Sequence, residues 1–280
     1  MQVIEDPAVF QRNCRAAGRV VVVPTMGALH EGHLALIRRA RELAGPEGSA
    51  AVSIFVNPIQ FDRQDDLAAY PKPLEADLAA CEREGADLVF VPTAGTMYAT
   101  DRSILVTESL LSRHLCGATR PGHFDGVCTV VLKLFLLSNA AAAVFGEKDF
   151  QQLAIIRRMV RDLDLPIEII GHPTIRESDG LAMSSRNVRL LLEHRADAPR
   201  IWQALIAARD LLPYGERNAA VFLEAARTHL LASPFFRIDY LEVVDAETLQ
   251  PVSAILRPSV LAVAGFYGGV RLIDHIRLHP

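Results

Sequence analysis

The alternation of apolar and polar positions predicts an α/β fold for the first part of the chain. Apolar runs of strand length occupy residues 19–24, 50–56, 87–91, 142–145 and 167–171. Between these runs, apolar residues recur at helical spacing over residues 34–43, 74–84, 127–137 and 150–163. Such alternation predicts a parallel sheet with helices on both faces. Ligands of these sheets bind beyond the carboxyl ends of the strands, so we expect the functional residues there.

The pattern changes near residue 174. Helical spacing over residues 201–212 and 219–231 precedes strand-like runs at residues 237–244, 260–266 and 270–276. We therefore predict two domains, residues 1–174 and residues 175–280, the second a smaller α+β domain with an antiparallel sheet. Within the first domain, Asp125 and Asp149 stand where helix N-caps are expected.

Composition indicates a globular protein of ordinary character. Half of the residues are apolar, 22% are charged, and the net charge is −4. An acidic protein is not built to hold nucleic acid, so an anionic ligand requires positive charge gathered locally. Four widely spaced cysteines predict buried apolar fillers in a reducing compartment. The start lacks a basic signal region, and the most apolar stretch is interrupted by Lys133 and Asn139. We therefore predict a cytoplasmic location and no membrane span.

The segment PTMGALHEGH, residues 24–33, carries the clearest chemical signal. It follows four consecutive valines and leads into a helical pattern, so a buried strand runs into a glycine-bearing turn and then a helix. Gly27 and Gly32 allow a sharp turn and a close approach to a ligand. Free N–H groups at the helix start attract an anion, and His30 and His33 add two side-chain donors. The combination predicts phosphate-directed chemistry on a nucleotide.

Two further segments follow predicted strands. FVNPIQF, residues 55–61, sets Asn57 and Gln60 in a turn, where amides suit a ligand with hydroxyls and a carboxylate. Taken alone, the segment is better explained as a capped surface turn. FGEKDFQQL, residues 145–153, brings Lys148 to a helix start, with Gln152 facing the same side. An exposed charged turn is the alternative there.

Two other segments carry weaker signals. AMSSRN, residues 182–187, sets Ser184, Ser185 and Arg186 in a row. These side chains suit a mobile phosphate clamp, since Arg can grip two oxygens of one phosphate, although a Ser-rich loop with a solvated Arg is the plainer interpretation. RPGHFDGV, residues 120–127, opens an apolar helix, and its Arg120 and His123 either reach the ligand or brace the turn.

Taken together, the motifs resemble one family. PTMGALHEGH, SIFVNPIQF, RPGHFDGV, FGEKDFQQLAIIRRMV and DGLAMSSRN occur in order, and the chain resembles the pantothenate synthetase (pantoate–β-alanine ligase) family nearly from end to end. The resemblance implies a Rossmann-like parallel sheet domain of the HIGH-motif nucleotidylyltransferase type, a smaller α+β domain that closes over the site, and a homodimer.

The resemblance also implies an ATP-dependent ligation in two steps. A carboxylate oxygen of pantoate attacks the α-phosphorus of ATP, which gives pantoyl adenylate and pyrophosphate. The β-alanine amine then attacks the acyl carbon, which releases pantothenate and AMP. Mg²⁺ is expected to accompany the triphosphate, with Asp77 and Asp149 as candidate ligands.

The family's functional positions transfer to this sequence by motif. Catalytic roles are expected for His30, His33, Lys148 and Arg186, with His33 as the proton donor. Pantoate is expected to bind Met26, Gln60 and Gln152, and β-alanine to bind near Gln60. The expected ATP-binding residues are Met26, Gly27, Ala28, Leu29, His30, Glu31, Gly32, His33, Gly146, Glu147, Lys148, Asp149, Ile175, Met183, Ser184, Ser185 and Arg186.

Three positions depart from the family pattern, and two other functions compete. The family often has Arg where Lys72 stands, Leu at Met183 and Asn at His275. A nucleotidylyltransferase shares the histidine turn but needs a pocket for an acceptor phosphate, which glutamines fit less well than a carboxylate. A non-catalytic nucleotide sensor predicts loss of His33, Lys148 or Arg186, and all three are present. A tRNA synthetase is disfavoured by the acidic balance.

Overall fold

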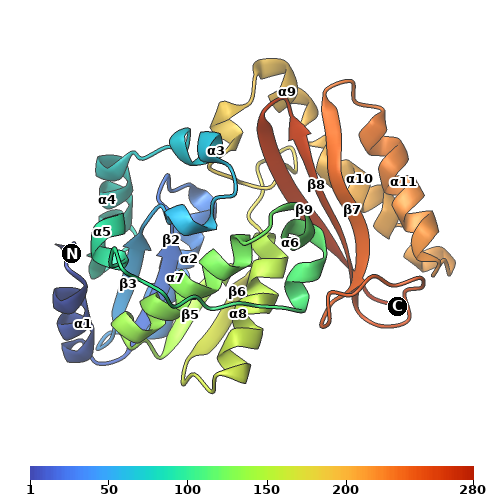
Figure 1. Ribbon diagram of the computed structural model, residues 1–280. Coiled ribbons are helices and arrows are strands. Elements are labelled where there is room, and N and C mark those ends of the chain that lie inside the picture. The colour runs from blue at the N-terminus through green and yellow to red at the C-terminus, as the bar shows by residue number, and fades with distance from the viewer. The chain divides into compact units, whose positions relative to one another are not determined.

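The computed structural model describes residues 1–280, and its larger sheet is parallel throughout. The six strands run in the order β1-β4-β3-β2-β5-β6 (Figure 1). Their bounds are β1 Gln2–Ile4, β2 Val20–Thr25, β3 Ser49–Ile54, β4 Leu88–Phe90, β5 Ala142–Gly146 and β6 Glu168–His172. Five of these strands confirm the predicted apolar runs. The order reverses direction between β2 and β5, and such a switch point is where ligands bind in open α/β sheets.

Helices cover this sheet. Their bounds are α1 Pro7–Ala16, α2 Glu31–Ala44, α3 Gln64–Ala68, α4 Leu74–Arg83, α5 Ala94–Met97, α7 His123–Ser138 and α8 Phe150–Asp162. Val21 and Val23 of β2 pack in one core cluster with buried residues of α2 and α4. Because successive side chains of a strand point to opposite faces, Val20 and Val22, which are also fully buried, face the other side. The valine run is therefore buried on both faces, as a central parallel strand requires.

Two elements near the start of the chain escaped the sequence prediction. β1 is a three-residue strand at the sheet edge, too short for a periodic signal. Helix α1 begins after Asp6, whose side chain accepts a hydrogen bond from the backbone N–H of Val9, and Pro7 occupies its first turn. Asp followed by Pro is a recognised helix start, so this signal was present in the sequence.

The prediction that Asp125 caps a helix is wrong. Helix α7 begins at His123, two residues earlier, and its N-cap is Gly122 in the left-handed region at φ 77°. Asp125 lies in the first turn instead, where its negative charge still faces the positive end of the helix dipole. Asp149 lies directly before α8, at the end of the short 3₁₀ helix η3 (Glu147–Asp149).

The smaller sheet is antiparallel and has the order β7-β8-β9. Its strands are β7 Phe236–Asp245, β8 Ser259–Tyr267 and β9 Val270–Leu278, which match the three predicted runs. The accompanying helices are α6 Leu115–Thr119, α9 Leu192–Asp197, α10 Arg200–Arg209 and α11 Ala219–Leu231. Helices α10 and α11 bury their apolar residues with those of the sheet in one core, so this part is an α+β unit.

Two compact units result, and neither is continuous in sequence. Unit 1 comprises Met1–Glu108, Pro121–Glu147 and Ile155–Pro173. Unit 2 comprises Ser109–Arg120, Lys148–Ala154 and Thr174–Pro280. The remaining 3₁₀ helices are η1 Pro58–Gln60, η2 Leu111–Arg113, η4 Asn187–Arg189 and η5 Leu212–Tyr214. No helix combines the length and the apolarity needed to cross a membrane. All four cysteines are buried free thiols, as predicted.

Candidate active site

The turn from β2 to α2 is held open by a buried carboxylate. Gly27 has φ 79° and Ala28 has φ 50°, so the chain turns through two left-handed residues. Asp77 of α4, only 3% exposed, accepts the backbone N–H of Ala28 at 2.8 Å and that of Leu29 at 2.7 Å. A Cβ on Gly27 would stand 2.9 Å from Oδ2 of Asp77, so glycine is required on steric as well as conformational grounds. Asp77 therefore fixes the shape of the turn.

Both histidines of the turn have their Nδ1 atoms engaged by the backbone. His30 is the N-cap of α2, and its Nδ1 accepts the N–H of Gly32 at 3.1 Å. Nδ1 of His33 accepts the N–H of His30 at 3.4 Å, which completes a reciprocal capping box. The two rings lie 4.1 Å apart between centroids. A neutral ring that accepts at Nδ1 carries its proton on Nε2, so each ring keeps one N–H that can donate.

Gln60, the expected pantoate ligand, is held by a chain of buried amides. Its Oε1 accepts from Nδ2 of Asn57 at 2.9 Å, and Oδ1 of Asn57 accepts the hydroxyl of Tyr98 at 2.7 Å. Asn57 is 1% exposed and Gln60 is 8% exposed. Because Oε1 is occupied, Nε2 of Gln60 is directed to Sδ of Met26, 3.2 Å away. The structure thus brings Gln60 and Met26 together, and burial raises the pKa of Tyr98 to about 12, which keeps its hydroxyl a donor.

The RPGHFDGV motif fixes the backbone of the same segment. Nδ1 of His123 lies 2.7 Å from the carbonyl oxygen of Gln60. The carbonyl of Gly126 accepts a second hydrogen bond from Asn57 at 3.1 Å. A Cβ on Gly126 would stand 2.5 Å from the carbonyl oxygen of Ile59, so only glycine lets α7 approach η1 this closely. Of the two interpretations offered for His123, the structure favours bracing of the turn.

A pocket of about 400 Å³ opens in unit 1 beside these residues. Its lining includes Met26 and Gly27 of the β2–α2 turn, Phe55 at the end of β3, and Lys72 and Asp77. The lining is mainly apolar, with one cationic side chain, which suits a small carboxylic acid with an aliphatic body. Lys72 lies outside the motifs, yet it brings positive charge to this pocket. Sequence analysis identified Lys72 only as a departure from the family pattern.

The expected site residues of unit 2 form two groups. In the first, the side chain of Lys148 is 19% exposed and its Nζ lies 4.0 Å from a carboxylate oxygen of Asp149, at the limit of an ion pair. Gln152 is half-buried on α8. Its neighbour Gln151 is buried and donates to the carbonyls of residues 111 and 114, so Gln151 anchors the helix start. Lys148 thus lies two residues before the start of α8, close to a helix N-terminus as predicted.

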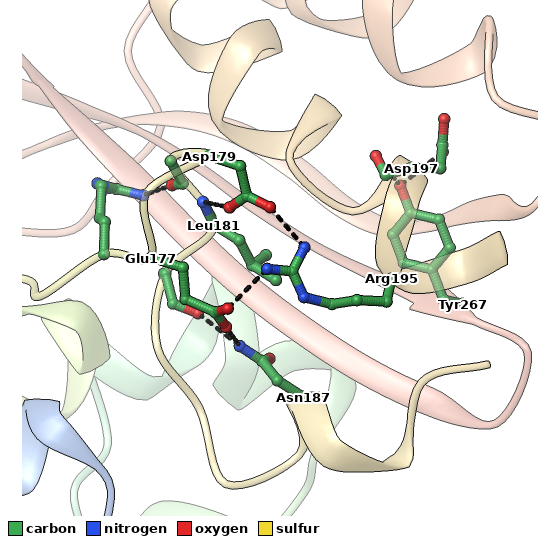
Figure 2. Close-up of polar contacts among 10 residues, drawn as sticks. Glu177, Asp179, Leu181, Asn187, Arg195, Asp197 and Tyr267 are labelled. Atoms are coloured by element: carbon green, nitrogen blue, oxygen red, sulfur yellow. Dashed lines mark hydrogen bonds and ion pairs between the residues drawn. The ribbon is translucent and has the colours of Figure 1, made fainter. Parts of the chain in front are cut away.

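The second group is the segment of residues 183–186. Its start is fixed to Ile175, whose carbonyl accepts the N–H of Met183 at 3.0 Å. Inside the segment, the Ser184 hydroxyl accepts the N–H of Arg186 at 3.2 Å. Figure 2 shows the polar contacts of Asn187, the residue that directly follows this segment. The expected ATP-binding residues Ile175 and Met183 are therefore paired.

Sequence reasoning missed three residues that shape the site. Tyr98 was not considered, Asn57 was judged a turn residue, and Asp77 was considered only as a metal candidate. Each bonds a residue that is distant in sequence. Tyr98 bonds Asn57 across 41 positions, Asn57 bonds Gly126 across 69, and Asp77 bonds Leu29 across 48. Only the tertiary structure reveals such pairs.

Comparison with known proteins decides the family. The family model described as pantoate-beta-alanine ligase matches residues 2–277. The chain belongs to the pantoate-beta-alanine ligase family. It is 53% identical over 271 residues to pantothenate synthetase of Akkermansia muciniphila, covering 97% of this chain and 96% of that protein. It is 49% identical over 284 residues to pantothenate synthetase of Desulfovibrio desulfuricans, covering 100% of both.

Solved structures of pantoate-beta-alanine ligases share the fold. The crystal structure of pantothenate synthetase from Thermus thermophilus matches with a TM-score of 0.93 and 45% identity, and 100% of each chain is covered. Pantoate-beta-alanine ligase from Francisella tularensis, complexed with β,γ ATP and β-alanine, matches with a TM-score of 0.81 and 29% identity over 99% of this chain and 97% of that chain. The expected α/β fold of the HIGH-motif type and the smaller α+β domain are confirmed.

Proposed function

We propose that this protein joins (R)-pantoate and β-alanine in an ATP-dependent reaction that forms pantothenate, AMP and pyrophosphate through pantoyl adenylate. The observation that carries the proposal is the β2–α2 turn, where His30 and His33 are both fixed at the start of α2 because each accepts a backbone N–H at Nδ1. The neighbour from Francisella tularensis binds an ATP analogue and β-alanine on the same fold, which supports an ATP-dependent carbon–nitrogen ligase.

Adenylation requires charge stabilisation at the phosphates. A pantoate carboxylate oxygen attacks the α-phosphorus in line with the departing pyrophosphate, so negative charge grows on the bridging and terminal oxygens. Lys148 and Arg186 supply positive charge, and His30, His33 and the N–H groups of the α2 start supply hydrogen-bond donors, with His33 in the role of proton donor. Ser184 and Ser185 add hydroxyl donors to the phosphates. Preorganised donors of this kind stabilise the transition state without reorganisation at the moment of reaction.

Pantoate binding orients the attacking carboxylate. We assign its hydroxyl and carboxylate groups to Gln60 and Gln152, and its apolar part to Met26 and the pocket in unit 1. The chain from Tyr98 through Asn57 fixes which end of the Gln60 amide faces the ligand. Holding the reacting groups in one geometry supplies a large part of the rate enhancement.

The second step forms the amide. The β-alanine amine, bound near Gln60, attacks the acyl carbon of the adenylate, loses a proton, and expels AMP. A free carboxylate would have to expel oxide, whereas the adenylate expels a phosphate monoester, so the single difficult step is replaced by two easier ones.

Magnesium enters with ATP as part of the substrate. Asp77 does not fit a metal ligand, because both of its oxygens accept backbone N–H groups inside the protein. Asp149 fits better, since its carboxylate is 49% exposed next to Lys148. Mg²⁺ commonly binds through phosphates and waters with one or two carboxylates, so we assign Asp149 as its candidate protein ligand.

A homodimer in the cytoplasm completes the proposal. Ile104 is 80% exposed and Leu136 of α7 is 60% exposed, both in unit 1. The segment that follows Ile104 lies along α7, because the N–H of Val106 donates to the Thr129 hydroxyl at 3.0 Å. Exposed apolar side chains of this kind suit contact with a second copy of the chain. Ile104→Glu should shift the mass measured by light scattering from dimer to monomer.

Pyrophosphate release tests the proposed reaction. Wild-type protein is mixed with ATP and Mg²⁺, first with pantoate and then with β-alanine added. A pantoate-dependent burst of about one pyrophosphate per site, followed by steady turnover when β-alanine is added, is expected for an adenylate mechanism. Absence of pantoate-dependent release would contradict the ligase, and release dependent on a phosphorylated acceptor would favour a nucleotidylyltransferase.

A further inference from the structure

The segment of residues 183–186 is anchored at both of its ends. At its start, the neighbouring residues Arg176 and Ala182 form an antiparallel bridge, so residues 175–183 make a short hairpin. At its end, Nδ2 of Asn187 donates to the carbonyl of Ala182 at 3.2 Å. The backbone N–H of Asn187 donates to the carbonyl of Ser184 at 3.0 Å. Asn187 and Ala182 therefore bracket the four residues and close them into a loop.

Arg195 of α9 binds two carboxylates of the hairpin, one of which connects it to this loop. One guanidinium nitrogen donates to Asp179 at 2.6 Å and the other donates to Glu177 at 2.6 Å. The second oxygen of Glu177 accepts Nδ2 of Asn187 at 2.9 Å. Figure 2 shows Arg195 between the two acidic residues, with Asn187 on the far side of Glu177. A continuous chain of hydrogen bonds thus runs from Arg195 through Glu177 to Asn187, the residue that closes the loop.

The charges of this cluster depend on Arg195. The hydrogen bond from Arg195 lowers the pKa of Asp179, and the same bond raises the pKa of Arg195. Side-chain exposures of 29% to 37% mean that these ion pairs add little to stability. Without Arg195, however, the carboxylates of Glu177 and Asp179 would lose their ion pairs with its guanidinium, beside the loop expected to bind phosphate. They would repel each other and would also repel an incoming triphosphate.

The other side of the hairpin is fixed independently. The guanidinium of Arg176 stacks 3.4 Å from the centroid of the Trp202 ring and pairs with Asp274 at 2.7 Å. Gly180 lies against the same ring, where a Cβ would stand 2.5 Å from the indole. The hairpin is therefore rigid on this side, and the contacts of Arg195 determine how Glu177 and Asn187 are presented on the other side.

From this geometry we propose that Arg195 is a positioning residue for ATP binding. It does not contact the nucleotide. Through Glu177 and Asn187, it holds residues 183–186 in the conformation that binds phosphate, and it neutralises the acidic pair beside them. The inference rests on the proposed function, since it assigns the loop to ATP.

Kinetics of the Arg195→Met variant test this role. The change keeps the aliphatic length and removes both ion pairs. A misplaced phosphate loop should lower kcat/KM for ATP by about tenfold to a hundredfold, because small displacements of binding groups have effects of this size. The KM for β-alanine should stay within about twofold, since the amine meets an adenylate that is already formed. The kcat/KM for ATP of Arg195→Lys should lie between the values of wild type and Arg195→Met, because an ammonium cannot bridge both carboxylates as a planar guanidinium does.

Arg209→Ala is the matched control. Arg209 lies on α10 of the same unit and pairs only with the exposed Asp210. This variant removes the same charge from the same unit and should keep wild-type kinetics. Equal kcat/KM for ATP in Arg195→Met and Arg209→Ala would overturn the proposal. If Arg195→Met does not fold, wild-type kcat/KM for ATP in Arg195→Lys would overturn it equally.

Limited trypsin digestion provides a readout that needs no turnover. Cleavage after Arg186 should be several times faster in Arg195→Met than in Arg209→Ala, since Glu177 has lost the ion pair that holds it in position to bind Asn187. Equal cleavage rates would contradict the positioning role. If wild-type protein released no pyrophosphate with pantoate, the proposed function would fail, whereas the digestion would still show whether Arg195 orders the loop.

Discussion

Replacing Asp77 with asparagine should disrupt the β2–α2 turn, although the change only replaces one carboxylate oxygen with an NH₂ group. The two oxygens of Asp77 accept the N–H groups of Ala28 and Leu29 at 2.8 and 2.7 Å. An amide offers one acceptor, so one N–H keeps its partner and the other faces the NH₂ group. The residue is 3% exposed, so water cannot replace the lost acceptor.

The size of the effect follows from these contacts. A hydrogen bond to a charged group contributes about 1.5–3 kcal/mol, and a buried donor left unsatisfied costs about 1–3 kcal/mol. Because these terms overlap, we expect Asp77→Asn to lower the free energy of unfolding by about 2–4 kcal/mol. The turn also carries the donors of His30 and His33, so kcat/KM for ATP should fall by about tenfold or more.

Urea unfolding followed by circular dichroism, together with pyrophosphate release, measures both quantities. Glu75→Gln is the control, because Glu75 lies in the same first turn of α4, is exposed, and loses the same charge. Loss of its interaction with the helix dipole should cost only about 0.3–1 kcal/mol. If Asp77→Asn and Glu75→Gln unfold at the same urea concentration and bind ATP equally, the bracing role assigned to Asp77 is refuted.

Three other substitutions test separate parts of the account. Gly126→Ala inserts a Cβ 2.7 Å from the backbone N of Gln60, so kcat/KM for pantoate should fall by about tenfold. A wild-type kcat/KM would show that α7 can move to accommodate the Cβ. Tyr98→Phe leaves Oδ1 of buried Asn57 without its donor, which should cost about 1–3 kcal/mol in urea unfolding and raise the KM for pantoate. For Asp197, burial raises the pKa, but hydrogen bonds from an arginine, a serine and a tyrosine outweigh it, so the folded pKa lies below its ordinary value of about 3.9. The ionised Asp197 therefore stabilises the fold above its ordinary pKa, and this stabilisation is lost as pH falls through the folded pKa. The difference in unfolding free energy between wild type and Asp197→Asn should be full at pH 6 and should shrink below about pH 4. A difference that does not change with pH would contradict this.

Local patterns predicted most of the fold. Four valines buried on both sides identified β2, and the apolar spacing of residues 219–231 gave the bounds of α11. Elements too short for periodicity, such as β1, were missed. The start of α7 was misplaced because Gly122 adopts a left-handed conformation, whereas an aspartate two residues inside the helix had looked like its cap.

The candidate site was only partly predictable. The residues of the β2–α2 turn that we expect to face phosphates are contiguous, so their spacing could be recognised in the sequence. The residues that orient them are distant in sequence, as Asp77 is from Leu29 and Tyr98 is from Asn57, 48 and 41 positions apart. Such pairs depend on how helices pack against the sheet. Arg195 lies only 18 positions from Glu177, yet a charged residue on a short helix carries no signal of its partner.

Isotope transfer tests the adenylate mechanism most directly. Pantoate labelled with ¹⁸O in both carboxylate oxygens is incubated with ATP, Mg²⁺, β-alanine and the wild-type protein, and the products are analysed by mass spectrometry. If a carboxylate oxygen attacks the α-phosphorus and AMP later leaves, one ¹⁸O should appear in each AMP and one should remain in the amide carbonyl of pantothenate. Unlabelled AMP, or label in inorganic phosphate with ADP as the other product, would contradict the adenylate.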